Sequence, residues 1–293
     1  MSFVALWLTV SGCSVLPRFG YENLPTLATW QADSYLSLNA EQKALASRRI
    51  EAVHAWHRRT QLDDYVSFLR EAQQRLAAGD VDEAQLRAWR LAALERLRPI
   101  AEQAAPGVAE VVTTLAPEQL GRMRAEMQRD NEKLRREWMP PARAERVEAR
   151  AKRYVQRAEL FLGPLSADQK QFARRFAADA PDTEDVWFAQ RLGRQQDLLE
   201  VMERIRVERP GEATATRWMR EHLLRYTQLR DGPDKAGAES SLASGDAMAA
   251  AMLARATPKQ RQHLQRKLQD WIELVESLKP AQTTRSGALL ATN

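Results

Sequence analysis

Three residues in the first third of the chain are spaced like metal ligands. Glu51, His54 and His57 follow one another at intervals of three, so a helix would carry them along one side. A metal site in a helical bundle needs further carboxylates and histidines from other helices. The remaining histidines, His222 and His263, lie in no similar pattern. We therefore expect no metal site, and we interpret His57 as a histidine whose ring is satisfied by hydrogen bonds.

No residue pattern indicates a catalytic nucleophile or an acid–base pair. The sequence contains no Gly-x-Ser-x-Gly motif and no glycine-rich phosphate loop. Ser47 and Ser166 are explained as a helix-surface residue and a helix cap. Asp63, Asp64 and the glutamates of segment 132–137 stand among other charges, where a general acid cannot be distinguished from a solvated surface. We expect no catalytic residues and no cofactor, and predict that the protein is not an enzyme.

The only cysteine follows an apolar run of eight residues. This run is far shorter than the roughly 20 residues that span a bilayer. The sequence Val10-Ser11-Gly12-Cys13 resembles a bacterial lipobox, in which a signal peptidase cleaves before a cysteine that becomes lipidated. The alternative is a buried N-terminal helix with an ordinary core cysteine. Pro17 and the polar residues after the cysteine favour the lipoprotein.

A lipobox also predicts a cellular address. Residues 1–12 would be the signal peptide, and Cys13, acylated for example with palmitate, would be the mature N-terminus. The peptide before the apolar run carries no Lys or Arg, which we attribute to a translation start further upstream. Ser14, and no Asp, follows the cysteine, which in enterobacterial-type sorting implies the outer membrane. We predict a lipid anchor in that membrane, with the protein on its periplasmic side.

The charge distribution argues against nucleic acid as a partner. The chain has 293 residues, with 44 basic and 39 acidic side chains and a net charge of +5. Basic and acidic residues alternate along the sequence instead of clustering. This pattern is typical of a solvated surface with many ion pairs.

Helical periodicity dominates the sequence, and no stretch alternates at period two. Four apolar stripes at helical spacing are Ala46, Ile50, Val53 and His57; Leu62, Tyr65, Val66, Leu69 and Leu76; Val147, Ala151, Tyr154, Ala158 and Phe161; and Leu264, Leu268, Trp271, Val275 and Leu278. Proline and glycine separate them. We predict an all-α fold, a bundle or array of about nine or ten amphipathic helices. Its expected parts are a tether over 13–37, helical halves over 38–162 and 163–279, and a disordered tail over 280–293.

A short pattern recurs where helices are expected to begin. Its four copies are Leu38-Asn39-Ala40-Glu41-Gln42, Leu115-Ala116-Pro117-Glu118-Gln119, Leu165-Ser166-Ala167-Asp168-Gln169 and Ala256-Thr257-Pro258-Lys259-Gln260. Asn39, Ser166 and Thr257 are typical N-caps, and the glutamine three residues later completes a capping box. Proline at the first helical position costs no hydrogen bond. Ala116 departs from the pattern because its side chain cannot cap.

The wider spacing suggests two related halves. Trp56 and Trp89 lie 33 positions apart, and Trp187 and Trp218 lie 31 apart. Each pair stands between two copies of the pentapeptide. Capped amphipathic helices resemble one another by default, so the spacing alone leaves the duplication open.

Two families are similar to this sequence. The pentapeptides resemble the Leu-Thr-x-x-Gln motif of the Spy/CpxP family of periplasmic helical proteins, which implies an ATP-independent chaperone or stress-response role. The arrangement as a whole resembles an uncharacterised family of proteobacterial lipoproteins with a domain of unknown function. The matching parts are the lipobox, Tyr21, Trp30, the Leu38–Gln42 start and Trp56-His57-Arg58-Arg59. That family implies no catalytic residue.

These observations predict a non-enzymatic, helical binding or chaperone-like protein. Its expected partners are the membrane, envelope proteins and unfolded clients. The candidate binding surface is Arg58 and Arg59, which could bind an anionic partner or complement a helix C-terminus, and Trp138, which ends a very polar helix. The alternatives are a structural component of an envelope assembly and an enzyme acting on peptidoglycan whose carboxylates are not recognisable.

Overall fold

The computed structural model describes residues 15–280, which form helices α1 to α13 and a short 3-10 helix, η2. No strand occurs in this part of the chain, so the predicted all-α class is confirmed, although its helices outnumber the nine or ten expected. Cys13, the predicted signal peptide 1–12 and residues 281–293 of the predicted tail lie outside the described residues.

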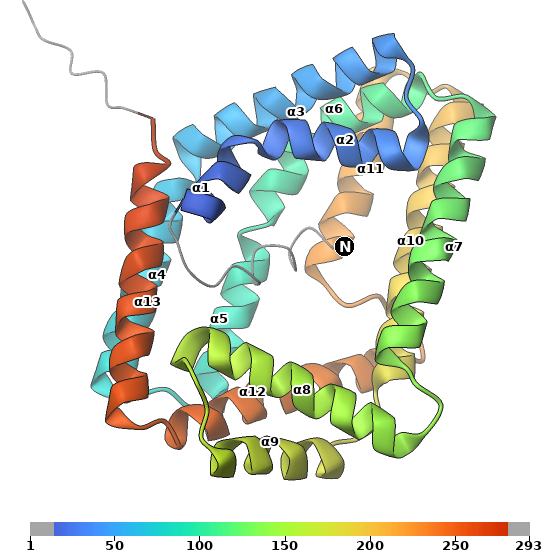
Figure 1. The fold of residues 1–293 in the computed structure, drawn as a ribbon. Coiled ribbons are helices and arrows are strands. Elements are labelled where there is room, and N and C mark those ends of the chain that lie inside the picture. Colours follow the sequence, from blue (N-terminus) through green and yellow to red (C-terminus); the bar gives the residue numbers. More distant parts are fainter. Residues whose placement is uncertain (1–14, 281–293) are drawn as a thin grey trace, which may run out of the picture.

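The helices form a four-sided ring (Figure 1). The top side contains α1 (Val15–Glu22), α2 (Leu24–Leu36), α3 (Ala40–Thr60) and α6 (Arg98–Thr113), with α11 (Glu212–Leu224) packed against α6. On the left, α4 (Leu62–Ala78) packs against α13 (Pro258–Ser277), and on the right α7 (Pro117–Trp138) packs against α10 (Glu184–Glu208). The bottom side contains α8 (Arg143–Leu162), α9 (Ala167–Asp179) and α12 (Lys235–Ala254). Helix α5 (Glu83–Glu95) packs against α12, and η2 (Arg225–Thr227) follows α11.

Two large clusters of buried apolar side chains hold the ring together. The first joins α2, α3, α6, α7, α10 and α11, and includes the fully buried Ile205 and Met219. The second joins α4, α8, α9, α12 and α13, and includes Leu264 and Leu268 of the fourth predicted stripe. Both clusters draw residues from both sides of residue 162, the predicted boundary between the halves.

Helices α3 and α6 approach each other closely at Gly107. A Cβ atom at this position would lie 2.8 Å from the Cβ of Arg49, which is closer than carbon atoms can pack. The Arg49 side chain also forms an ion pair with Glu110, one turn further along α6. Glycine therefore allows α6 to lie directly against α3 at the top of the ring.

Within residues 15–280, no helix combines the length and the apolar character that a bilayer span requires. The same residues contain no group of three or more His, Cys, Asp or Glu side chains placed to hold a metal ion.

Candidate functional site

The ring contains a half-open cavity of about 1600 Å³. Its wall comes mainly from α1, α2, α3, α4, α6 and α13, so residues from both ends of the described chain meet there. Most of the lining side chains are apolar, among them Leu24, Ile50, Val53, Leu69, Ile100 and Val108. The first predicted stripe, Ala46 to His57, forms one wall.

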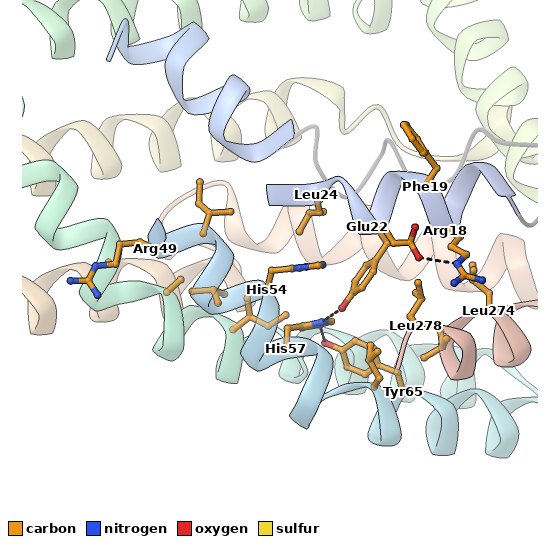
Figure 2. A pocket seen from close by; sticks show the side chains of 18 of the residues that line it. Arg18, Phe19, Glu22, Leu24, Arg49, His54, His57, Tyr65, Leu274 and Leu278 are labelled. Carbon is orange, nitrogen blue, oxygen red and sulfur yellow. Dashed lines mark hydrogen bonds and ion pairs between the residues drawn. The ribbon is translucent and has the colours of Figure 1, made fainter. Parts of the chain in front are cut away.

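A row of polar side chains crosses the apolar wall. The Tyr21 hydroxyl and His57 Nδ1 lie 2.8 Å apart, and His57 Nε2 and the Tyr65 hydroxyl lie 3.1 Å apart. The imidazole thus has a partner on each nitrogen, as expected for His57, and in its neutral form one nitrogen accepts while the other donates. Figure 2 shows His57 of α3 between α1 and Tyr65 of α4.

Burial keeps this row neutral. It raises the pKa of both Tyr21 and Tyr65 to about 12. Burial, together with the neighbouring His54, lowers the pKa of His57. At neutral pH the row therefore presents hydroxyl and imidazole groups without charge. Such groups can orient a ligand by hydrogen bonding, and they leave the wall compatible with apolar chains.

The metal-like spacing of Glu51, His54 and His57 does not bring the three side chains together. Glu51 accepts a hydrogen bond from Ser47 on the exposed side of α3. His54 stacks at a tilt on Tyr21, with ring centroids 4.8 Å apart. Sequence reasoning missed the two tyrosine partners of His57. Tyr21 lies 36 positions before His57 and Tyr65 eight positions after it, so only the meeting of α1, α3 and α4 joins them.

The four recurring pentapeptides meet in pairs at two opposite corners of the ring, where α3 and α7 begin and where α9 and α13 begin (Figure 1). At the first corner the Gln42 and Gln119 amides donate to each other, at 3.1 and 2.9 Å. The Gln42 amide also donates to the Thr114 carbonyl, and the Gln119 amide to the Leu36 carbonyl. Both glutamines are buried. The motif thus fastens two helix starts to each other.

The predicted caps are confirmed at three of the four starts. Asn39, Ser166 and Thr257 each accept from the backbone of a glutamine three residues later, and each glutamine returns a bond to the cap. Ala116 supplies no side-chain acceptor, but its backbone N–H still donates to Gln119 Oε1. The residue before each cap is buried: Leu38, Leu115, Leu165 and Ala256.

The sequence of this chain matches one known protein family. The model of a family of unknown function, DUF6279, matches residues 34–225, which is more than half of the chain. The protein belongs to the DUF6279 family. No curated protein and no solved structure matches it. The sequence-based resemblance to an uncharacterised family is therefore confirmed. The DUF6279 match includes His54, His57 and Tyr65 of the cavity wall, while Tyr21 and the whole of α13 lie outside it.

The predicted basic pair of this DUF6279 protein is split between two environments. Arg58 Nε donates to the Leu278 carbonyl, 3.0 Å away, at the C-terminal end of α13. Arg58 thus complements the C-terminus of a helix 220 positions away and not that of its own. Arg59 is exposed.

Trp138 is half-buried in a stack of its own. Its ring lies parallel to that of Trp187, with centroids 5.1 Å apart, and the Arg153 guanidinium lies 4.7 Å from its ring centre. Trp138 ends α7 and Arg58 lies near the end of α3, and these two helix ends lie at opposite corners of the ring (Figure 1). The structure therefore does not combine the predicted binding residues into one surface.

Proposed function

We propose that this DUF6279 protein is a lipid-anchored, outer-membrane lipoprotein on the periplasmic side that binds apolar segments of unfolded polypeptides without catalysis. The single observation that carries the binding role is the cavity of about 1600 Å³ inside the ring. Val10-Ser11-Gly12-Cys13 supports the anchor. The Spy/CpxP-like pentapeptides agree with a chaperone-like role.

The size and charge of the cavity favour a polypeptide segment. Small-molecule sites typically occupy about 300–1,000 Å³, and this cavity is larger. Its charged lining residues number three basic and three acidic, namely Arg18, Arg49, Lys267, Glu22, Asp270 and Glu273. Since these charges balance, apolar contact would dominate binding, and clients of either net charge would be accepted.

The shifted pKa values of the described carboxyl groups do not favour the peptidoglycan-acting alternative. A carboxyl group that acts as a general acid needs a pKa raised toward neutral pH. The carboxyl groups with a shifted pKa are instead all shifted downward: Asp33, Asp182, Glu184, Glu203 and Asp231.

We also propose that the ring arose by internal duplication. The pair Gln42–Gln119 and the pair Gln169–Gln260 share the same reciprocal amide bonds and the same return bonds to their caps. Two copies of one unit of five consecutive helices, α3–α7 and α9–α13, each with a pentapeptide at the start of its first and last helix, would produce this arrangement.

The binding role is tested with a matched pair of substitutions. Val108 lines the cavity and is 37% exposed, whereas Val207 is 60% exposed and does not line it. We expect Val108→Trp to reduce protection of an aggregating client by the mature protein, because the indole would fill part of the cavity. Val207→Trp adds the same side chain elsewhere and should leave protection unchanged.

The assay should be run at low and high salt, with Arg59→Ala as a further variant. Protection that persists at high salt and in Arg59→Ala would support apolar binding in the cavity. Equal protection by Val108→Trp and Val207→Trp would exclude the cavity as the binding site. No protection at any stoichiometry would remove the chaperone-like role and favour a structural component of an envelope assembly.

A further inference from the structure

We propose that the exposed face of α1 and α2, which begins at the rim of the cavity, is a membrane-docking surface that inserts into the lipid headgroup region. The proposal rests on the lipid anchor at Cys13 proposed above. The surface is a stripe of five residues, called here the α1–α2 stripe: Phe19, Thr26, Leu27, Trp30 and Ser34. All five are exposed.

Helical geometry places these residues on one side of nearly continuous helices. Asn23 departs from helical geometry, with φ −94° and ψ 6°, and α1 meets α2 at an angle. Backbone bonds from Asn23 N to the Phe19 carbonyl and from Leu27 N to the Asn23 carbonyl, both 3.0 Å, still bridge the junction. Residues 11 apart then lie roughly on the same side, because about 3.6 residues make one turn. Phe19 and Trp30 are 11 apart.

The opposite side of the same helices is buried. Tyr21, Thr29 and Leu36 pack into the ring. Phe19 lies at the rim of the cavity, which it helps to line, and points away from His54 and His57 (Figure 2). Phe19 is 62% exposed and Trp30 is 64% exposed, and no other large apolar side chain of the described residues matches either value. Large apolar side chains exposed along one side of neighbouring helices are candidates for an interaction site.

The distance from the anchor selects a bilayer as the occupant. Six residue steps separate Cys13 from Phe19. Even a fully extended chain spans at most about 3.6 Å per residue, so Phe19 stays within about 22 Å of the acylated cysteine. The first exposed aromatic of the stripe therefore cannot leave the neighbourhood of the membrane surface.

The charges near the stripe favour apolar insertion over attraction to anionic lipid. Arg18 and Glu22 form an ion pair with each other, 2.9 Å apart, so this part of α1 carries little net charge. Trp and Phe are the residues that amphipathic helices bury at the boundary between headgroups and acyl chains. Acyl chains alone leave the ring free to turn, whereas a docked stripe would fix its orientation on the membrane.

The test uses the full-length lipidated protein in vesicles of phosphatidylethanolamine and phosphatidylglycerol with nitroxide-bearing acyl chains. Lipidation blocks the Cys13 sulfur, so Thr26→Cys offers a single thiol for an environment-sensitive fluorophore. Gln171→Cys is the control, because it is exposed on α9, at the bottom of the ring and opposite α2 (Figure 1). We expect blue-shifted emission and several-fold stronger lipid quenching at position 26 than at 171. Adding Phe19→Ser and Trp30→Ser to Thr26→Cys should remove the difference while the protein still floats with the vesicles.

Other outcomes would overturn the proposal in distinguishable ways. Equal quenching at positions 26 and 171 in a protein that floats would exclude docking but leave the anchor intact. If each chain took up two fluorophores and the protein did not float with the vesicles, Cys13 would have a free thiol. This result would overturn both the anchor and the docking surface. A blue shift at position 26 that depends on the protein-to-lipid ratio, without lipid quenching, would assign the stripe to a second copy of the chain.

Discussion

The side-chain amides of Gln169 and Gln260 hydrogen-bond to each other in both directions, at 2.8 and 3.0 Å. Each amide nitrogen also donates to a backbone carbonyl beside the other helix start, Arg255 for Gln169 and Pro164 for Gln260. Each amide oxygen accepts a further bond from the N–H of its own cap residue. Both side chains are buried, so this corner of the ring depends on every one of these bonds.

The first prediction concerns this glutamine pair. Gln169→Ala and Gln260→Ala should each lower the free energy of unfolding by about 1–3 kcal/mol, because each leaves a buried amide unsatisfied. The double variant should cost less than the sum, with a coupling energy of about 0.5–3 kcal/mol measured by denaturant unfolding. Gln171→Ala, exposed on the same helix, is the control and should have no effect. Strict additivity would contradict the reciprocal bond.

The second prediction concerns the helix caps. Ser166→Ala should destabilise the protein by about 0.5–2 kcal/mol through loss of the cap bond. Ala116→Ser should be neutral or slightly stabilising, because it supplies a side-chain acceptor at the start of α7, where Ala116 offers none. Thermal or denaturant unfolding measures both. If neither substitution changed stability but both abolished a cellular phenotype, the pentapeptides would have to bind a partner.

The third prediction concerns the lipid anchor. Mass spectrometry of the mature protein should show cleavage between Gly12 and Cys13 and an acylated N-terminus. Cys13→Ser should release the protein from the membrane fraction. An N-terminal peptide that extends through residues 11–13 with a free thiol would disprove the anchor.

The fourth prediction concerns a buried ion pair between α8 and α10. Arg150 bonds Glu184 through Nε and Nη2, at 2.9 and 2.7 Å, and both residues are buried. Glu184→Gln should destabilise the fold by about 1.5–3 kcal/mol, because it removes the carboxylate from two Arg150 donors and leaves Asp182, 2.8 Å from Nη2, to balance the charge. Asp231→Asn, which breaks an exposed pair with Lys235, should leave stability unchanged. An equal loss in the two variants would contradict this account.

The Arg150–Glu184 pair should also affect how stability depends on pH in acid. Burial raises the pKa of Glu184, but the hydrogen bonds and charge of Arg150 outweigh burial and hold that pKa below its ordinary value. A carboxyl group whose pKa is lower in the folded than in the unfolded protein stabilises the fold at pH values above its unfolded pKa. That stability is lost as the pH falls through the folded pKa. The pH dependence of unfolding below about pH 4.5 should therefore be weaker in Glu184→Gln than in the natural sequence.

The fifth prediction concerns His222 of α11. Burial lowers its pKa from 6.5 to about 4, although Asp197 opposes the shift. Between these values the unfolded chain binds more protons than the folded one, so stability should fall as pH drops from 6.5 to 4. His222→Phe should flatten this part of the stability curve measured by unfolding at a series of pH values. An unchanged slope would show that other groups cause the loss.

The local properties of the chain could be predicted because neighbouring residues determine them. Apolar residues at helical spacing and the caps Asn39, Ser166 and Thr257 were sufficient to predict an all-α fold and three helix starts. The hydrogen-bonded state of His57 could be expected as well, because an imidazole on an apolar stripe needs partners. The lipobox-like sequence Val10-Ser11-Gly12-Cys13 is a local pattern too, and it predicts the lipid anchor.

The ring and its cavity depended on contacts between residues far apart in sequence. Gln42 and Gln119 are 77 positions apart, and nothing in either pentapeptide says which other copy it will bond. Arg58 donates to the Leu278 carbonyl, 220 positions away. The sequence alone was equally compatible with Arg58 binding an anion. Helical periodicity defines which face of a helix is apolar but not which helix covers that face. Only the packing of α1, α3, α4 and α13 decided that the stripe from Ala46 to His57 would line a cavity instead of closing into a solid core.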